Sequence, residues 1–293
     1  MTKALFYRIL TVVALILTFA IGITGCTSST TGISDTSTSN TGDMPGSNVS
    51  VIGSTSVGPL MQQLADEFSD KNPNILVDIQ QVGSSQGIKA AIDGTAQIGM
   101  SSRDLKDSEK GTLTEHVMAL DGIAIVTNPS NPVKDFTMEQ VQKIFKGEIK
   151  NWKEVGGPDS PIIVLSREDG AGTRAAFEEM LDLQIKNDDR VKSLVTKKAL
   201  IFDSSGAIKT NVASKHNAIG YISLAAVDDS VVSISIDGVE CTPETIRDNS
   251  YPLGRSFLLV TKGKLSDNAQ DFLDYVMSDE AQEIISKDYI SAK

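Results

Sequence analysis

A single arginine, Arg167, begins a glycine-rich turn whose residues could bind an anion. An apolar run at 161–165 precedes the turn and is typical of a buried strand, and residues 175–181 after it have helical composition and spacing. A helix that starts in this way exposes unpaired backbone N–H groups at the positive end of its dipole, which suits an oxyanion. The Arg167 guanidinium adds a planar fork of donors. Ordinary helix capping explains the turn, Gly170 to Thr173, equally well.

Three further turns favour the anion interpretation, because each is rich in hydroxyl groups and follows an expected strand. They occupy residues 53–59, 82–87 and 99–104. Serine and threonine are common N-cap residues, so capping alone accounts for one hydroxyl in each turn. Taken with the Arg167 turn, they indicate one chemistry, in which neutral donors and one or two guanidinium groups bind a ligand without a metal.

The elements that must position these turns alternate between strands and helices along the chain. This pattern predicts an α/β protein with mainly parallel sheets, and its length favours two lobes with a ligand cleft at the carboxyl ends of strands. Residues 57–70 carry an apolar stripe typical of a helix, and residues 117–127 are apolar enough for a buried strand. Residues 267–286 are expected to form one long amphipathic helix.

The N-terminus has the features of a targeting segment. Lys3 and Arg8 precede an apolar core at 9–23, and small residues then lead to Cys26, as in the lipobox of lipoprotein signal peptides. The alternative is an uncleaved anchor, although 15 apolar residues are short for a membrane span of about 20. Residues 26–48 are rich in Ser, Thr and Gly, which predicts a flexible tether. With Cys26 modified, Cys241 has no partner for a disulfide within the chain.

Charge and residue composition argue against several classes of function. The net charge is −11, and loss of residues 1–25 would remove Lys3 and Arg8 and give about −13. No Lys/Arg-rich run is present, which argues against a nucleic-acid partner. A phosphate-ester hydrolase would need a nucleophile with a base or a metal cluster, yet the two histidines, His116 and His216, are isolated in the sequence. We therefore expect no enzyme activity, no metal and no cofactor.

Taken in their order along the chain and together with the lipobox, the turns described above and a few further segments resemble the phosphate-binding lipoproteins of phosphate ABC importers, within the periplasmic-binding-protein superfamily. The resemblance spans about residues 49–290. It rests on segments 53–59, 83–85, 98–103, 119–122, 149–152, 167–173 and 218–221. It implies a two-lobed fold of type II with two hinge-crossing strands, placed near 125–127 and 258–260. The implied organisation is a signal peptide at 1–25, a tether at 26–48, lobe 1 at 49–126 and 260–293, and lobe 2 at 127–259.

The same resemblance implies roles for individual residues. Hydroxyl and backbone groups of lobe 1 would donate to phosphate, namely those of Thr55, Ser56, Ser84 and Ser102. From lobe 2, Arg167 would do so together with the helix start at Ala171, Gly172 and Thr173. The family commonly has serine where this chain has Ala171, and some members have aspartate where it has Ser102. The acceptor for a phosphate O–H must then come from elsewhere, and Asp121 is the candidate, with a structural ion pair to an arginine as the alternative. Asp169 is expected to orient Arg167. Arg103 could either help to orient Arg167 or bind the ligand itself.

The sequence thus predicts a monomeric, lipid-anchored receptor on the extracytoplasmic face of the cell membrane. It would capture inorganic phosphate by closing its lobes and pass it to an ABC permease. The alternative ligands are sulfate, molybdate and tungstate.

Overall fold

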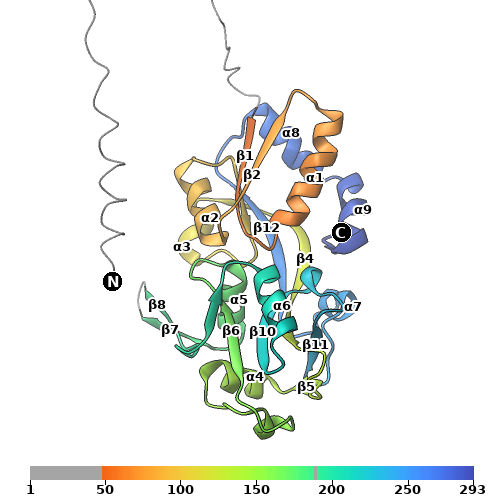
Figure 1. Ribbon diagram of the computed structural model, residues 1–293. Helices are drawn as coiled ribbons and strands as arrows, with labels where there is room; N and C mark the ends of the chain where they lie inside the picture. Colours follow the sequence, from red (N-terminus) through yellow and green to blue (C-terminus); the bar gives the residue numbers. More distant parts are fainter. Residues whose placement is uncertain (1–47, 188–189) are drawn as a thin grey trace, which may run out of the picture. The chain divides into compact units, whose positions relative to one another are not determined.

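A strand of fourteen residues, β4 (Thr114–Thr127), runs through both halves of the structure and explains how they are joined. The computed structural model describes residues 48–187 and 190–293, and the side chains outside 186–190. The expected signal peptide and Cys26 lie outside the described residues, as does nearly all of the expected tether. Figure 1 shows the two α/β lobes with β4 and β12 (Gly254–Thr261) passing between them. The predicted two-lobed α/β fold is confirmed.

Lobe 1 is built on the strand order β2-β1-β3-β12-β4. Strands β1, β2 and β3 are parallel, whereas β12 is antiparallel to both of its neighbours. The other elements of this lobe are β1 (Asn48–Gly53), α1 (Gly58–Lys71), β2 (Leu76–Gln81), α2 (Ser84–Asp93), β3 (Ile98–Ser101), α3 (Asp107–Lys110), α8 (Asp267–Val276), α9 (Asp279–Asp288) and β13 (Ile290–Ser291). The predicted stripe of α1 is buried and packs with α8 and α9 against the sheet.

Lobe 2 continues the sheet from the far end of β4 in the order β4-β10-β6-β9, and β11 flanks β4 on its other edge. Its elements are β5 (Asp135–Phe136), α4 (Met138–Lys146), β6 (Ile163–Arg167), α5 (Gly172–Met180), β7 (Gln184–Asn187), β8 (Arg190–Ser193), β9 (Leu200–Phe202), α6 (Ser205–Ser214), β10 (Ala218–Ser223), β11 (Val232–Ile236) and α7 (Pro243–Arg247), with short 3-10 helices at Trp152–Val155 and Leu224–Ala226. The sheet as a whole is mixed, so the expectation of mainly parallel sheets was wrong: β4 and β12 are antiparallel to their neighbours.

The strands with which β4 and β12 pair indicate where each of them passes from one lobe to the other. Ile125 and Thr127 already pair with β10 and β11 of lobe 2, and Leu258 and Val260 pair with β3 inside lobe 1. The hydrophobic cores divide the chain in the same way, with Ile123–Val126 in one core and Met118, Ala119 and Phe257 in the other. We therefore propose that the chain crosses between the lobes at residues 120–123 and 253–255, a few residues away from the expected positions.

The C-terminal segment forms two helices, not the single helix expected over 267–286. Helix α8 ends at Val276, and Ser278 caps the start of α9 by accepting the backbone N–H of Ala281 at 3.2 Å. Asp279 and Glu280 then occupy the first turn, where acidic side chains are favoured by the helix dipole. Of the helices that the structure describes, none is long and apolar enough to cross a bilayer.

Candidate functional site: an anion cleft between the lobes

Three helices begin at the cleft without a side-chain hydrogen bond at the N-cap position. Helices α1, α2 and α5 show no side-chain hydrogen bond at their N-caps, Val57, Gly83 and Ala171. By contrast, α4, α6, α8 and α9 are each capped by a serine or threonine hydroxyl. Before α1, Ser54 Oγ accepts the backbone N–H groups of Ser56 and Val57, but the N-caps of α2 and α5, Gly83 and Ala171, have no side-chain oxygen that could accept one. First-turn N–H groups left free in this way suit an anion.

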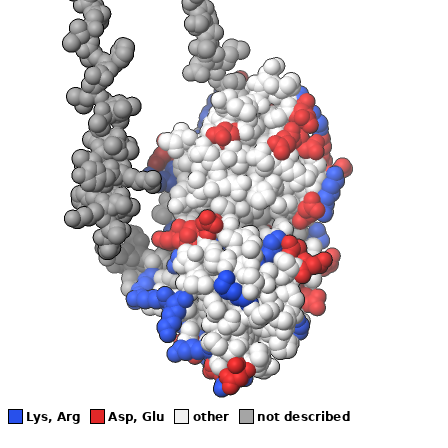
Figure 2. Space-filling view, viewed as in Figure 1, with Lys and Arg blue, Asp and Glu red and all other residues white. Residues whose placement is uncertain are grey.

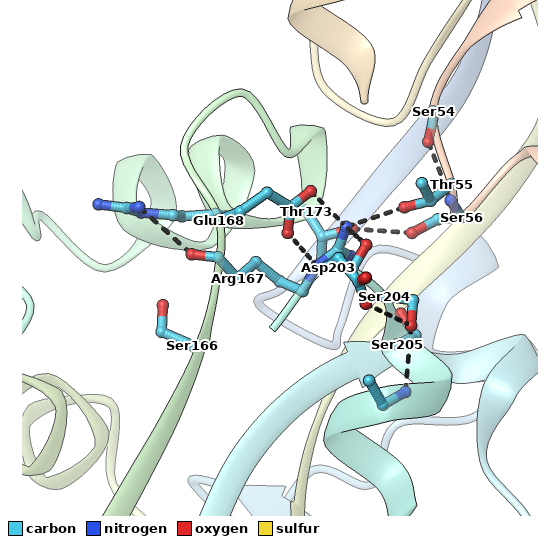
Figure 3. Close-up of polar contacts among 12 residues, drawn as sticks. Ser54, Thr55, Ser56, Ser166, Arg167, Glu168, Thr173, Asp203, Ser204 and Ser205 are labelled. Carbon is cyan, nitrogen blue, oxygen red and sulfur yellow. Dashed lines mark hydrogen bonds and ion pairs between the residues drawn. The ribbon is translucent and has the colours of Figure 1, made fainter. Parts of the chain in front are cut away.

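Pairs of polar groups meet across the cleft, one from each lobe. Arg167 Nη2 donates to Thr55 Oγ1 at 2.8 Å, and the hydroxyls of Ser56 and Thr173 are 2.9 Å apart. Figure 3 shows this arrangement, with Arg167 and Thr173 of lobe 2 facing Thr55 and Ser56 of lobe 1. At the rim, the backbone N–H of Ser85 donates to the carbonyl of Gly170 at 3.2 Å. The lobes are thus closed on each other around the site.

Three serines of lobe 1 form a buried hydroxyl network beneath these pairs. Ser54 Oγ accepts the backbone N–H groups of Ser56 and Val57 and donates to Ser102 Oγ at 2.9 Å. Ser84 Oγ accepts the N–H of Ser102 at 3.1 Å and lies 3.4 Å from its hydroxyl. Because Ser54 must accept twice, its proton is committed to Ser102, which leaves the Ser102 proton free to point elsewhere. Sequence reasoning did not single out Ser54.

Helix α5 of lobe 2 approaches this network at Gly172. A Cβ atom on Gly172 would lie 2.1 Å from Ser84 Oγ and 2.6 Å from Ser102 Oγ, distances that no real side chain tolerates. Gly172 therefore lets the helix start come within contact of both hydroxyls. The cleft brings together Thr55, Ser56, Ser84, Ser102, Arg167, Ala171, Gly172 and Thr173, which are eight of the ten predicted binding residues.

Arg167 is the cation of the site, and only 1% of its surface is exposed. Its Nη2 donates to Thr55, to the carbonyl of Asp203 and to Glu168, and its Nε also donates to Glu168. Its Nη1 is buried and has no hydrogen-bond partner among the described residues. A buried guanidinium nitrogen without an acceptor is costly, so Nη1 is suited to bind an anion oxygen.

The carboxylate that orients Arg167 is Glu168. Both of its oxygens accept from Arg167 at 2.9 Å, whereas Asp169 is exposed at the next position in the turn. We therefore assign to Glu168 the orienting role expected of Asp169. Residue type did not distinguish two neighbouring acids, and the choice depends on the direction in which the chain leaves β6.

The other two predicted binding residues have their charges paired elsewhere. Arg103 forms a two-pronged ion pair with Glu109, with contacts of 2.8 and 2.9 Å, and also donates to the carbonyl of Asp104. Asp121 is buried and accepts from Arg255 at 2.7 and 2.9 Å and from Ser223 at 2.8 Å.

The Asp121–Arg255 ion pair joins the two crossing strands. Arg255 Nη1 also donates to the carbonyl of Ser102, which connects the pair to the site without placing either charge against the ligand groups. Burial lowers the pKa of Arg255, and the Asp121 carboxylate opposes that change. The arrangement corresponds to the structural alternative considered for Asp121.

A cavity of about 520 Å³ opens beside the paired groups and forms the mouth of the cleft. Its lining includes Thr55, Ser56, Asp203, Ser204 and Ser205.

Figure 2 shows acidic and basic side chains interspersed, largely along the edges of one face. No group of His, Cys, Asp and Glu that could hold a metal occurs in the described part of the chain. The site therefore offers neutral donors and one arginine, within a chain of net charge −11.

Comparison with known proteins shows the class to which this fold and cleft belong. A model described as the PBP superfamily domain matches residues 30–280. The chain therefore belongs to this superfamily of binding proteins, and within it to the family of phosphate-binding proteins related to PstS. It is similar to the phosphate-binding protein PstS of Bacillus subtilis, with 33% identity over 82% of this chain and 78% of that protein.

Solved structures give the same result. The chain is 48% identical to a phosphate ABC transporter substrate-binding protein of Clostridium perfringens with bound phosphate, at a TM-score of 0.78, covering 84% of this chain and 100% of the other. It is 38% identical to an ABC-type phosphate transport receptor of Vibrio cholerae, at a TM-score of 0.72, covering 83% and 99%.

Proposed function

We propose that this protein is an extracytoplasmic receptor that captures inorganic phosphate in the interlobe cleft and delivers it to an ABC-type permease. The observation that carries the proposal is the unpaired Nη1 of Arg167, buried at a cleft where the starts of α2 and α5 meet hydroxyl groups from both lobes. Such a site supplies donors to a small tetrahedral anion from every side. The names of the related proteins support phosphate as that anion.

In the proposed complex each lobe contributes its own contacts. Thr55, Ser56, Ser84 and Ser102 donate from lobe 1, and Arg167 with the first N–H groups of α5 donates from lobe 2. A ligand can stabilise the closed state only to the extent that it binds that state better than the open one. Because an anion in this position would bridge both lobes, phosphate binding and closure are coupled.

The attachment to the membrane is also a proposal. We infer that Cys26 becomes lipidated after cleavage of residues 1–25, so that the body acts as a monomer held by residues 26–48 at the outer face of the membrane. The lipobox-like sequence supports this assignment. Cys26→Ser should abolish incorporation of a labelled lipid, and a variant that still incorporated label would contradict it.

Calorimetric titration tests the ligand. The protein should bind phosphate more tightly than sulfate, molybdate or tungstate, and Arg167→Ala should weaken phosphate binding by at least a hundredfold. Arg247→Ala removes the same charge from an exposed position on α7 and is the control. If another oxyanion bound more tightly than phosphate, that oxyanion would replace phosphate as the proposed ligand. Turnover of a phosphate ester in a parallel assay would instead favour the less favoured alternative, a phosphate-ester hydrolase.

A further inference from the structure

The backbone of Arg167 lies where the sheet of lobe 2 separates. Strand β10 pairs with β6 only at Ile163 and Val164, while β9 pairs with β6 from Leu165 to Arg167. On the β10 side, Arg167 therefore lacks a neighbouring strand to accept its N–H group. The residue that carries the charge of the site is thus attached to the sheet along one edge only.

The side chain of Tyr221, from β10, fills this gap. Its hydroxyl accepts the backbone N–H of Arg167 at 3.2 Å and forms a hydrogen bond of 2.8 Å with Ser166 Oγ. The ring is fully buried and stacks on Phe177 with 3.9 Å between ring centroids and an interplanar angle of 14°. Phe177 belongs to α5, the helix whose first residues, Gly172 and Thr173, meet lobe 1.

We propose that Tyr221 is a positioning residue for anion binding: its hydroxyl fixes the backbone of Arg167, and its ring fixes α5 relative to that backbone. Through these two contacts, and beside the hydrogen bond of 3.2 Å from Arg174 of α5 to the Arg167 carbonyl, Tyr221 helps to set the distance between the guanidinium and the helix start, the two groups with which lobe 2 binds the anion. Because the hydroxyl bonds to the backbone and to Ser166, it acts through Arg167 and does not touch the ligand. This inference rests on the proposed function.

The Tyr221→Phe variant removes the hydroxyl and keeps the stacked ring. It leaves the N–H of Arg167 without its acceptor, so the strand end should become mobile and the Kd for phosphate should rise by about five- to tenfold. Amide hydrogen exchange in residues 163–168 should accelerate. Tyr251→Phe is the matched control, because Tyr251 is also buried in lobe 2 and donates one hydrogen bond, to the carbonyl of Ile123 at 2.9 Å.

The two variants separate positioning from general stability when phosphate titrations and denaturant unfolding are compared. Both should unfold more easily, but only Tyr221→Phe should bind phosphate more weakly. A Kd within twofold of the wild type in Tyr221→Phe, or an equal loss in Tyr251→Phe, would overturn the inference and leave the proposed function standing. If the wild-type protein does not bind phosphate, the proposed function is wrong and the inference falls with it.

Discussion

Gly172 offers the sharpest test of closure, because a single methyl group placed there should hold the lobes apart. In Gly172→Ala the new Cβ would begin 2.1 Å from Ser84 Oγ, whereas ordinary contact starts at 3.4 Å, so the shortfall is about 1.3 Å. Both serines are held by hydrogen bonds and have little freedom to move away. The lobes must then separate by about that amount.

A separation of this size stretches contacts that are now short. The Arg167–Thr55 bond of 2.8 Å and the Ser56–Thr173 bond of 2.9 Å would each exceed 3.5 Å and be lost. A third hydrogen bond, to the less closely enclosed anion, should be lost as well. At roughly 1 kcal/mol for each of the three bonds, the free energy of phosphate binding becomes less favourable by about 3 kcal/mol, which raises the Kd about a hundredfold. The stability of the fold should not fall, because alanine is favoured over glycine in a helix.

Calorimetric titration of phosphate and denaturant unfolding measure the two effects separately. Gly111→Ala is the control, because Gly111 follows α3 with a φ of −75° and a Cβ there would meet no atom within 4 Å. It should leave the phosphate Kd unchanged. Native affinity in Gly172→Ala, or an equal loss in Gly111→Ala, would refute the argument that close contact at Gly172 is required.

Three other predictions follow from single residues. Arg167→Lys should weaken phosphate binding at least tenfold in a titration, since an ammonium cannot replace the fork that holds Thr55 and the anion together. Asp121→Asn should lower the free energy of unfolding by about 3 kcal/mol, because Arg255 is left unpaired; a smaller preference for phosphate over sulfate would instead support Asp121 as the proton acceptor. Burial raises the pKa of Cys241 to about 12. Because the thiolate is the reactive form, its alkylation at pH 8 should be slow until the protein is unfolded.

Much of the site could be predicted because its groups follow strands directly. Ser56, Ser84 and Ser102 each stand within a few residues of a strand end, and sheet geometry brings such ends together. In the same way, the glycine-rich turn that follows β6 indicated Arg167 and Gly172 as binding residues. These predictions needed only the order of strands and the types of residue in the turns.

The errors came from choices that depend on three-dimensional direction. Glu168 and Asp169 are adjacent acids, and only the path of the turn decides which of them reaches Arg167. Composition allowed one helix over 267–286 because Met277 and Ser278 do not disrupt the apolar stripe, although Ser278 followed by two acids is a recognisable N-terminal signal. The strand near 258–260 was expected, but the antiparallel direction of β12 was not, because pairing between segments distant in sequence leaves no local trace.

The position of β12 has a consequence for the order in which the protein can fold during synthesis. In the sheet of lobe 1, β12 lies between β3 and β4, two strands that follow each other in the chain. These strands therefore have no direct pairing with each other and must wait for residues 254–261. Helices α8 and α9, which complete the same core, come later still. Lobe 1 therefore depends on the C-terminal part of the chain for its central strand and for two of its helices, whereas most strands of lobe 2 precede Gly254 in the sequence.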